Sequence, residues 1–158
     1  MTVELSTKGG TELKERFETF TVLINKISRS IKKIKNQEMV EYGLRSTHVS
    51  CLYYLYSADL TATELCERCE EDKATISRAL DLLESQGFLV CRSRAAKRYK
   101  SPLALTEKGK EAAERIHGAV GRVLDEVGVG LSDAQRKDLY GYLSIICDNL
   151  VRIADAIS

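Results

Sequence analysis

Apolar side chains recur at intervals of three and four residues through the first quarter of the chain. An α-helix has about 3.6 residues per turn, so this spacing places them along one face of a long helix over residues 11–36. The stretch EYGLRSTH (41–48) interrupts the pattern, with Gly43 as the expected C-terminal cap and Ser46 opening the next helix. The apolar face consists of Leu13, Phe17, Phe20, Ile24, Ile27, Ile31 and Ile34.

The middle of the chain carries signals of three short helices. THVSCLYYLYS (47–57) predicts a mostly buried helix. TATE (61–64) is a capping box, in which Thr61 and Glu64 each bond the other's backbone amide, and it predicts a helix to about Cys69. A tight turn, EED (70–72), comes next.

Asp72 is placed to cap a third helix, which should run to about Gln86 and stop at Gly87. Two helices joined by a turn of about three residues form a helix-turn-helix. FLVCRSR (88–94) and SPLAL (101–105) predict two short strands, with Pro102 suited to an edge strand. A hairpin directly after a helix-turn-helix is a wing.

Two long helices are expected in the remainder of the chain. Thr106 caps the first, over residues 107–127, and two glycines end it. SDAQ (132–135) is a second capping box, which opens a helix running to about Ile157.

The last helix bears on the oligomeric state, because LYGYLSIICDNLVRIADAI (139–157) is apolar on more than one face. A surface helix needs an apolar stripe of only about 100°, so a further surface must cover the excess. We expect a homodimer through the chain ends; the alternative is an intramolecular three-helix core. The expected organisation is an N-terminal dimerisation helix (1–42), a winged helix-turn-helix lobe (43–105) and C-terminal dimerisation helices (106–158).

Composition limits the class of protein. The chain has 158 residues, of which 44% are hydrophobic and 30% charged, as in folded globular domains. No apolar run is long enough to span a bilayer and the N-terminus lacks the features of a signal peptide, so no membrane partner is expected. Five cysteines without an export signal favour free thiols in the cytoplasm.

The net charge of +1 is nearly neutral, but the charge is unevenly distributed. Residues 73–100 contain seven basic and two acidic side chains. A basic segment that combines a helix start and a wing has the polarity that phosphate binding requires. The alternative is a solvated run of charges.

The helix that starts at Asp72 has an apolar face and a polar N-terminal end. Recognition helices contact base edges with their first turns, where small polar side chains allow close approach. Arg78 lies opposite the apolar face and could pair with guanine O6 and N7. An ordinary amphipathic surface helix is the alternative. The first turns carry Lys73, Ala74, Thr75, Ser77 and Arg78.

Three stretches together resemble the MarR family of winged-helix regulators: EYGLRSTHVSCLYYLY, LTATELCERCEEDKATISRALDLLESQGFLV and LALTEKGKE. The most specific parts are DKATISRALDLLESQG, which is similar to the family's recognition helix, and LTEKG behind the wing. The resemblance covers residues from about 20 to 150. It implies a mainly α dimer with a small β-hairpin wing, joined through its terminal helices, that binds a pseudo-palindromic operator in double-stranded DNA.

By this resemblance, Lys73, Thr75, Ser77 and Arg78 would face the major groove and Arg98 would enter the minor groove. The wing departs from the family pattern, because Lys97 and Tyr99 occupy the positions at which relatives commonly carry aspartate and arginine. The aspartate that usually orients an arginine is therefore missing. The remaining basic side chains of the wing still favour phosphate; the expected wing contacts are Arg94, Lys97, Arg98 and Lys100.

The resemblance also implies an effector pocket between the dimer helices and the DNA-binding lobe, with small aromatic acids as frequent ligands. Its expected lining is Tyr42, Arg45, His48 and Tyr53; aromatic side chains that complete the core are the alternative. Cys66 and Cys69 form a C-x-x-C without a second ligand pair, so packing is favoured over a zinc site. Cys51, Cys91 and Cys147 are likewise expected to pack.

We see no catalytic constellation and expect neither an enzyme, a cofactor nor a metal. The sequence thus predicts a DNA-binding regulator, in particular a ligand-responsive repressor. Two alternatives stay open: a thiol- or metal-responsive sensor, and a winged-helix module that binds proteins without specific DNA binding.

Overall fold

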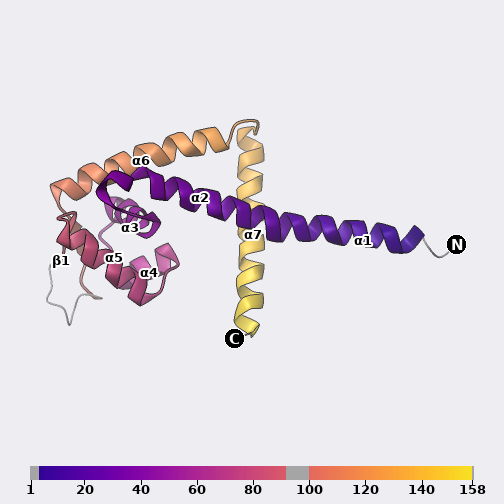
Figure 1. The fold of residues 1–158 in the computed structure, drawn as a ribbon, viewed down its shortest axis with the longest axis horizontal. Coiled ribbons are helices and arrows are strands. Elements are labelled where there is room, and N and C mark those ends of the chain that lie inside the picture. The colour runs from indigo at the N-terminus through magenta and orange to yellow at the C-terminus, as the bar shows by residue number, and fades with distance from the viewer. Residues whose placement is uncertain (1–3, 92–99, 158) are drawn as a thin grey trace. The chain divides into compact units, whose positions relative to one another are not determined.

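The computed structural model describes residues 4–91 and 100–157, which form helices and one two-stranded antiparallel sheet (Figure 1). The mainly α fold with a small hairpin is therefore confirmed. The chain divides into two compact units, Met1–His117 and Gly118–Ser158, and the division falls within one helix. Within the described residues, no helix combines the length and the apolar character needed to cross a membrane.

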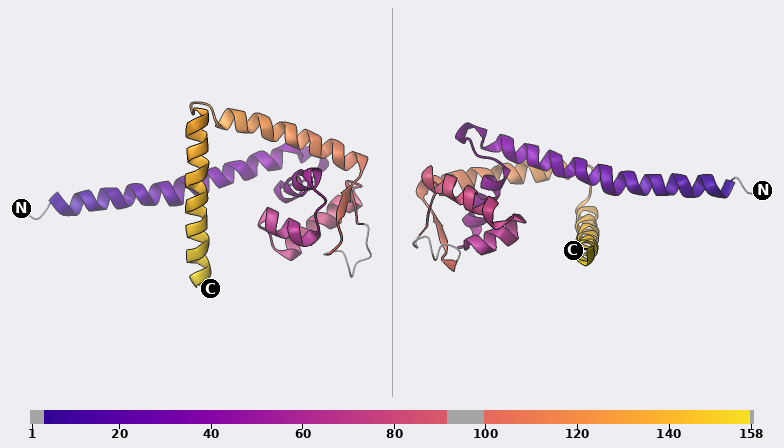
Figure 2. Two further views of the ribbon diagram at one scale, coloured as in Figure 1. Left: turned by 180° about the vertical axis from the view of Figure 1, so that it is seen from behind. Right: turned by 60° about the horizontal axis from the view of Figure 1, so that its bottom comes forward.

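The first helix is interrupted by a π-helical segment. It consists of α1 (Glu4–Phe17), η1 (Glu18–Leu23) and α2 (Ile24–Glu38), which follow one another as a continuous rod in both views of Figure 2. The backbone at both junctions keeps right-handed helical angles, so the chain continues in the same direction. The sequence predicted one uninterrupted helix over residues 11–36. That prediction was wrong in two details, the range of the helix and the absence of a π-helical segment.

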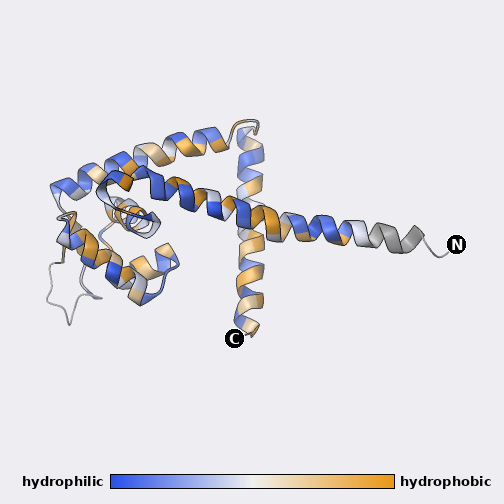
Figure 3. Ribbon diagram, in the orientation of Figure 1, coloured by the Kyte–Doolittle hydropathy of each residue, from blue (hydrophilic) through white to orange (hydrophobic). Residues whose placement is uncertain are grey.

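The apolar face of this rod is exposed in the single chain. Phe17 is 60% exposed, Ile27 50% and Ile31 49%, and orange apolar positions recur along α2 among blue polar ones in Figure 3. In α2 no residue is buried. The stripe is therefore not part of the core of the Met1–His117 unit.

A tight connection joins α2 to the next helix. A 3-10 turn, η2 (Val40–Tyr42), ends at Gly43, whose φ of +67° suits a residue without a Cβ. The helix α3 (Ser46–Ser57) follows, and the Asn36 side chain accepts a 2.7 Å hydrogen bond from the Ser46 amide. The predicted breaks at Gly43 and Ser46 are confirmed.

The two predicted helices of the helix-turn-helix are present as α4 (Ala62–Cys69) and α5 (Lys73–Ser85). At the start of α4, the Thr61 amide donates to Glu64 at 2.7 Å, and the Glu64 amide donates to the Thr61 hydroxyl at 3.3 Å. This reciprocal pair is the predicted capping box. Helices α3, α4 and α5 pack against one another around a fully buried core that includes Leu52, Leu65, Ile76, Leu80 and Leu83.

The hairpin pairs β1 (Leu89–Cys91) with β2 (Leu103–Leu105) in antiparallel register, Val90 opposite Ala104. β2 begins after Pro102, later than predicted, and residues 92–94 of the predicted first strand lie outside the described part, which leaves out residues 92–99. The Leu103 amide also donates a 2.9 Å hydrogen bond to the Leu60 carbonyl. The base of the hairpin is thereby attached to the loop that precedes α4.

Helix α6 (Glu107–Val127) follows the hairpin directly. In the Met1–His117 unit, Arg115 forms an ion pair with Glu41 and lies 3.9 Å from Glu38. Glu41 is the largest cause of the raised Arg115 pKa. Arg115 thus connects α6 to the end of α2 and to η2.

The Gly118–Ser158 unit contains the end of α6 and the helix α7 (Asp133–Ile157). The Ser132 amide donates to the Gln135 side chain at 2.8 Å and the Gln135 amide to the Ser132 hydroxyl at 3.2 Å, which confirms the second capping box. No residue of α7 is buried, although its sequence is largely apolar (Figure 3). Cys147, expected to pack, is exposed in this chain.

Candidate nucleic-acid interface

Helix α5 begins with a side-chain cap from Asp72. Its carboxylate accepts a 2.8 Å hydrogen bond from the Thr75 amide, and the Asp72 carbonyl accepts the first intrahelical bond from the Ile76 amide. The bond from the Thr75 amide is the largest cause of a lowered Asp72 pKa. The cap satisfies an amide that has no partner within the helix and fixes the helix start.

The two faces of α5 differ sharply. Ile76, Ala79, Leu80 and Leu83 are buried against the rest of the lobe. Lys73, Ala74 and Arg78 are exposed at the N-terminal end, while Thr75 and Ser77 are half-buried. The five predicted helix contacts therefore lie on the first turns of one helix, held to the core by its opposite face.

A chain of hydrogen bonds positions Arg78. The Thr75 hydroxyl donates to the second Asp72 oxygen at 3.1 Å and accepts from Arg78 Nη2 at 3.3 Å. A guanidinium has five N–H donors, so this single bond leaves others for a ligand. The resemblance implied that Thr75 faces the major groove; in the structure its hydroxyl joins Asp72 to Arg78. The spacing of three residues from Asp72 to Thr75 and from Thr75 to Arg78 was the sequence pattern that could have indicated these two hydrogen bonds.

The turn between α4 and α5 has a left-handed residue. Glu70 has a φ of +52°, and the Glu71 amide donates to the Cys66 carbonyl at 3.1 Å. This closes the end of α4 and lets the chain reach Asp72 within two residues. The predicted turn at residues 70–72 is confirmed.

The hairpin is attached to α5 at its base. The Cys91 amide donates a 3.1 Å hydrogen bond to the Glu84 side chain, which lies on α5. Lys100 is exposed beside β2. The other three predicted wing contacts, Arg94, Lys97 and Arg98, lie outside the described residues.

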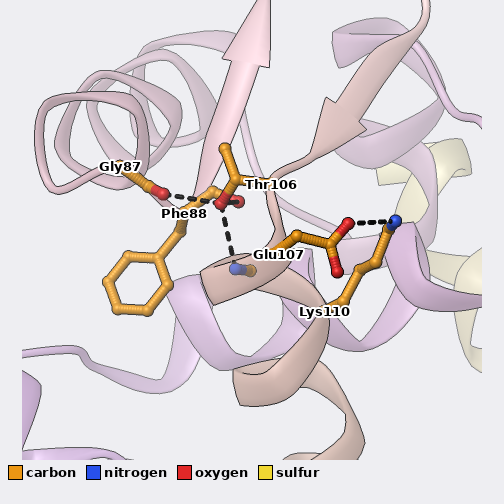
Figure 4. Close-up of polar contacts among 6 residues, drawn as sticks. Gly87, Phe88, Thr106, Glu107 and Lys110 are labelled. Carbon is orange, nitrogen blue, oxygen red and sulfur yellow. Dashed lines mark hydrogen bonds and ion pairs between the residues drawn. The ribbon is translucent and has the colours of Figure 1, made fainter.

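Thr106 connects the segment after α5 to the start of α6, as Figure 4 shows. Its hydroxyl donates to the Gly87 carbonyl at 2.6 Å and accepts from the Gly109 amide at 3.1 Å. The predicted cap at Thr106 is confirmed, and it also bonds the turn that ends α5. Glu107 and Lys110 form an ion pair on the adjacent turn.

Sequence reasoning missed Lys108, which also bonds this junction. Its ammonium donates to the Gln86 carbonyl at 2.7 Å and lies 4.2 Å from the centre of the Phe88 ring. The carbonyl belongs to the C-terminal end of α5, where a cation is favoured by the helix dipole. No local sequence pattern indicates this contact, because it depends on the path of the chain that brings Lys108 beside Gln86.

The residues expected to line an effector pocket have different partners. Tyr42 packs edge-on against Phe88 at 5.9 Å, whereas Tyr53 stacks on His117 at 4.2 Å. The His117 ring nitrogen Nε2 also lies 3.0 Å from the Tyr53 carbonyl oxygen.

Arg45 and His48 are joined at the start of α3. The Arg45 amide donates to His48 Nδ1 at 2.9 Å, so the imidazole accepts through an unprotonated nitrogen. Burial is the larger cause of the lowered His48 pKa, and the Arg45 charge adds to it. These two residues therefore have a capping role in α3.

Comparisons with known proteins agree with this fold. A family model described as MarR family matches residues 42–98. A MarR transcriptional regulator from Methanosarcina mazei Go1 is 25% identical, with a TM-score of 0.71 over 86% of this chain and 92% of that chain. A MarR family regulator from Neisseria meningitidis is 21% identical, with a TM-score of 0.76 over 90% and 99%.

A third similar structure is a MepR–DNA complex from S. aureus. It is 18% identical, with a TM-score of 0.73 over 82% of this chain and 97% of that chain. The comparison with curated proteins found no match.

Two helices joined by a tight turn and followed by a hairpin define this protein as a winged helix-turn-helix protein. Its fold is that of the MarR family of transcriptional regulators, and the resemblance seen in the sequence is confirmed.

Proposed function

We propose that the protein is a homodimeric transcriptional regulator that binds a pseudo-palindromic operator in double-stranded DNA. The observation that carries the proposal is the start of α5, where exposed Lys73 and Arg78 follow a capped N-terminus and the opposite face is fully buried. This end of the helix is capped by Asp72 and free of bulky apolar groups. It suits insertion into a major groove.

Each residue at the start of α5 has a proposed task. Arg78, oriented by Thr75, pairs with a guanine, while Lys73 neutralises phosphate. Ala74 and Ser77 are small enough for close approach to base edges. Together with Lys100, the wing residues Arg94, Lys97 and Arg98 add basic charge for the minor groove and the flanking phosphates. The S. aureus MepR–DNA complex supports DNA as the partner.

Dimerisation follows from the unburied apolar helices. Ile27 and Ile31 on α2 are about half exposed, as are Leu143 and Leu150 on α7. Monomeric proteins rarely expose such large continuous apolar areas. A second copy covers both sets at once, and its two-fold symmetry explains why two α5 helices would contact half-sites one helical turn apart.

Repression and effector response complete the proposal. A dimer seated on an operator blocks transcription, and an effector releases it by favouring a different arrangement of the lobes. Tyr42, Arg45, His48 and Tyr53 are the proposed effector contacts. Cytoplasmic location is part of the same proposal.

Footprinting and fluorescence anisotropy on the DNA upstream of the chain's own gene test this function. We expect a protected region with two-fold symmetry and an affinity that falls steeply with salt, because phosphate contacts release counterions. Equal affinity for the footprinted duplex and for a scrambled duplex of the same composition would contradict specific recognition. That outcome would favour the protein-interaction module instead.

A further inference from the structure

The Asp72 carboxylate makes two bonds at the start of α5, and the helix cap requires only one of them. One oxygen accepts the Thr75 amide at 2.8 Å, which completes the cap. The second oxygen accepts the Thr75 hydroxyl at 3.1 Å. Asparagine caps a helix as well as aspartate does, but its amide nitrogen cannot accept a hydroxyl proton. The second oxygen therefore has a role beyond the start of the helix.

The Thr75 hydroxyl has a fixed direction in this arrangement. A hydroxyl has one proton to donate and two lone pairs with which to accept. Its proton is donated to Asp72, and one lone pair accepts Arg78 Nη2 at 3.3 Å. Thr75 is therefore an acceptor that holds a guanidinium. While it is bonded to Asp72 it has no proton to donate to a phosphate or to a base.

The three side chains follow the spacing of neighbours on a helix surface. Residues three apart lie side by side, so Asp72 reaches Thr75 and Thr75 reaches Arg78. Asp72 and Arg78 are exposed and Thr75 is half-buried. The bond from the Thr75 amide is the largest cause of the lowered Asp72 pKa, and the Arg78 charge acts in the same direction. An ionised carboxylate thus stands at one end of the chain of bonds and a guanidinium at the other.

We propose that Asp72 and Thr75 form a relay that sets base discrimination by positioning Arg78. The inference rests on the proposed function, in which Arg78 pairs with a guanine. That pairing requires two donors of the planar guanidinium to point at O6 and N7 together. An arginine that is already held loses less rotamer freedom on binding than one that is not. The relay therefore favours the base that matches the held side chain.

The charge of Asp72 has a second, opposing effect on DNA. It is exposed next to Lys73, at the end of α5 proposed to enter the groove, and a carboxylate there repels phosphate. Asp72 should therefore lower the affinity for every duplex while it raises the preference for the correct one. This combination separates positioning from charge attraction, because a residue that only attracts phosphate changes the affinity for all duplexes alike.

Asp72→Asn tests the relay with little change of shape. It keeps the cap but places a donor where the second oxygen was, and this donor competes with Arg78 for the Thr75 lone pairs. Fluorescence anisotropy compares the footprinted operator with an operator changed at the base pair where Arg78→Ala loses discrimination. We expect Asp72→Asn to lose about fivefold in discrimination, the value of one net hydrogen bond. It should bind the scrambled duplex at least as tightly as the wild type does.

Thr75→Val and Thr75→Ser form a matched pair, compared once their circular dichroism matches the wild type. Valine keeps the branched shape and removes the hydroxyl, so it should lose discrimination. The slope of log affinity against log salt should stay unchanged, because no phosphate contact is removed. Serine keeps the hydroxyl and should retain discrimination. A valine variant that discriminates like the wild type, or that lowers the salt slope, would overturn the proposal.

Glu70→Gln is the control for charge. Glu70 is exposed two residues before Asp72, and within the described residues its carboxylate has no hydrogen bond or ion pair with Arg78. The substitution should change the affinity for both operators by the same factor and leave discrimination unchanged. Loss of discrimination equal to that of Asp72→Asn would assign the effect to net charge and contradict positioning.

A measurement without DNA separates the relay from the proposed function. Nitrogen-15 relaxation of the Arg78 Nε–H group, assigned by its loss in Arg78→Lys, reports the order of this side chain. We expect Thr75→Val to lower the order parameter and Thr75→Ser to keep it. Equal values in the wild type and the valine variant would refute the relay. An ordered Arg78 that valine releases, in a protein that binds no duplex specifically, would instead defeat the proposed function and the role in discrimination while the relay stands.

Discussion

The hydroxyl of Thr106 donates a 2.6 Å hydrogen bond to the carbonyl oxygen of Gly87, nineteen residues earlier in the chain. The same oxygen accepts the Gly109 amide at the start of α6. Thr106→Val keeps the shape of the side chain and removes both bonds, so we expect a loss of about 1–3 kcal/mol in the free energy of unfolding. Urea denaturation followed by circular dichroism measures it.

Thr106→Ser is the matched control, because it retains the hydroxyl. It should lie within about 1 kcal/mol of the wild type. Equal stability of the valine variant and the wild type would mean that neither bond contributes.

Gly109 and Gly121 lie on the same helix, α6, and should respond oppositely to alanine. A Cβ at Gly109 would overlap the backbone carbonyl of Phe88, whereas a Cβ at Gly121 meets no atom within 4 Å. We expect Gly109→Ala to destabilise by about 1–3 kcal/mol or more, since the backbone beside β1 must move. Gly121→Ala should stabilise by about 0.5–1 kcal/mol through helix propensity. Thermal denaturation of both variants under identical conditions distinguishes them, and similar melting temperatures would contradict the packing described.

Arg78 is the test of base recognition. If it pairs with a guanine, Arg78→Ala should weaken operator binding by about 1–3 kcal/mol and reduce discrimination against a changed base pair. Arg78→Lys retains the charge but loses the planar pair of donors. We expect lysine to restore binding to nonspecific DNA but not the discrimination, measured by anisotropy with matched and substituted duplexes. Full recovery of discrimination by lysine would assign Arg78 to phosphate.

His48 predicts a dependence of stability on pH. Its folded pKa lies below the ordinary value of 6.5, because burial and Arg45 disfavour the charged ring. The unfolded chain therefore binds more protons as pH falls through 6.5, and the His48 contribution, complete above that pH, is lost progressively toward the folded pKa. Urea midpoints measured from pH 8 to pH 5 should show this decline.

His48→Gln provides the control for the pH dependence. Glutamine accepts the Arg45 amide at the same helical position but does not titrate, so the helix start is kept. The decline assigned to His48 should be absent in this variant. An identical pH profile in wild type and variant would place its origin elsewhere.

The proposed dimer predicts that substitutions on the two sides of α2 affect association differently. Ile27 belongs to the apolar stripe, while Asn25 lies well away from it at about 100° per residue. Ile27→Glu buries an unpaired charge in the proposed interface, a cost of about 3–5 kcal/mol, and should give monomers in sedimentation equilibrium. Asn25→Glu should remain dimeric. Dimers in both variants would exclude α2 from the interface.

Local signals made much of the fold predictable. The caps at Thr61, Asp72, Thr106 and Ser132 depend on residues within three positions of one another, and all four are present. The π-segment Glu18–Leu23 has no such marker, since its flanking residues keep ordinary helical angles. The sequence pattern therefore predicted the helices well and their internal irregularity not at all.

The sequence pattern predicted which residues of α5 form the candidate site. It did not predict the contacts that join the surrounding segments to one another. The spacing of Lys73, Ser77 and Arg78 on one polar end followed from helical periodicity. The contacts of Arg115 with Glu41 and of Lys108 with Gln86 join segments far apart in the chain. Cys69 was expected to fill the core, and its half-exposed position depends on where α4 ends.

The bond from the Leu103 amide to the Leu60 carbonyl has a mechanical consequence. It fastens the strand returning from the hairpin to the segment that opens α4, while Glu84 holds the outgoing strand to α5. The base of the hairpin is thus bonded to both helices of the motif or to the residues directly before them. In the proposed complex with DNA, contacts of the hairpin with the phosphate backbone and contacts of α5 with bases would therefore be mechanically coupled.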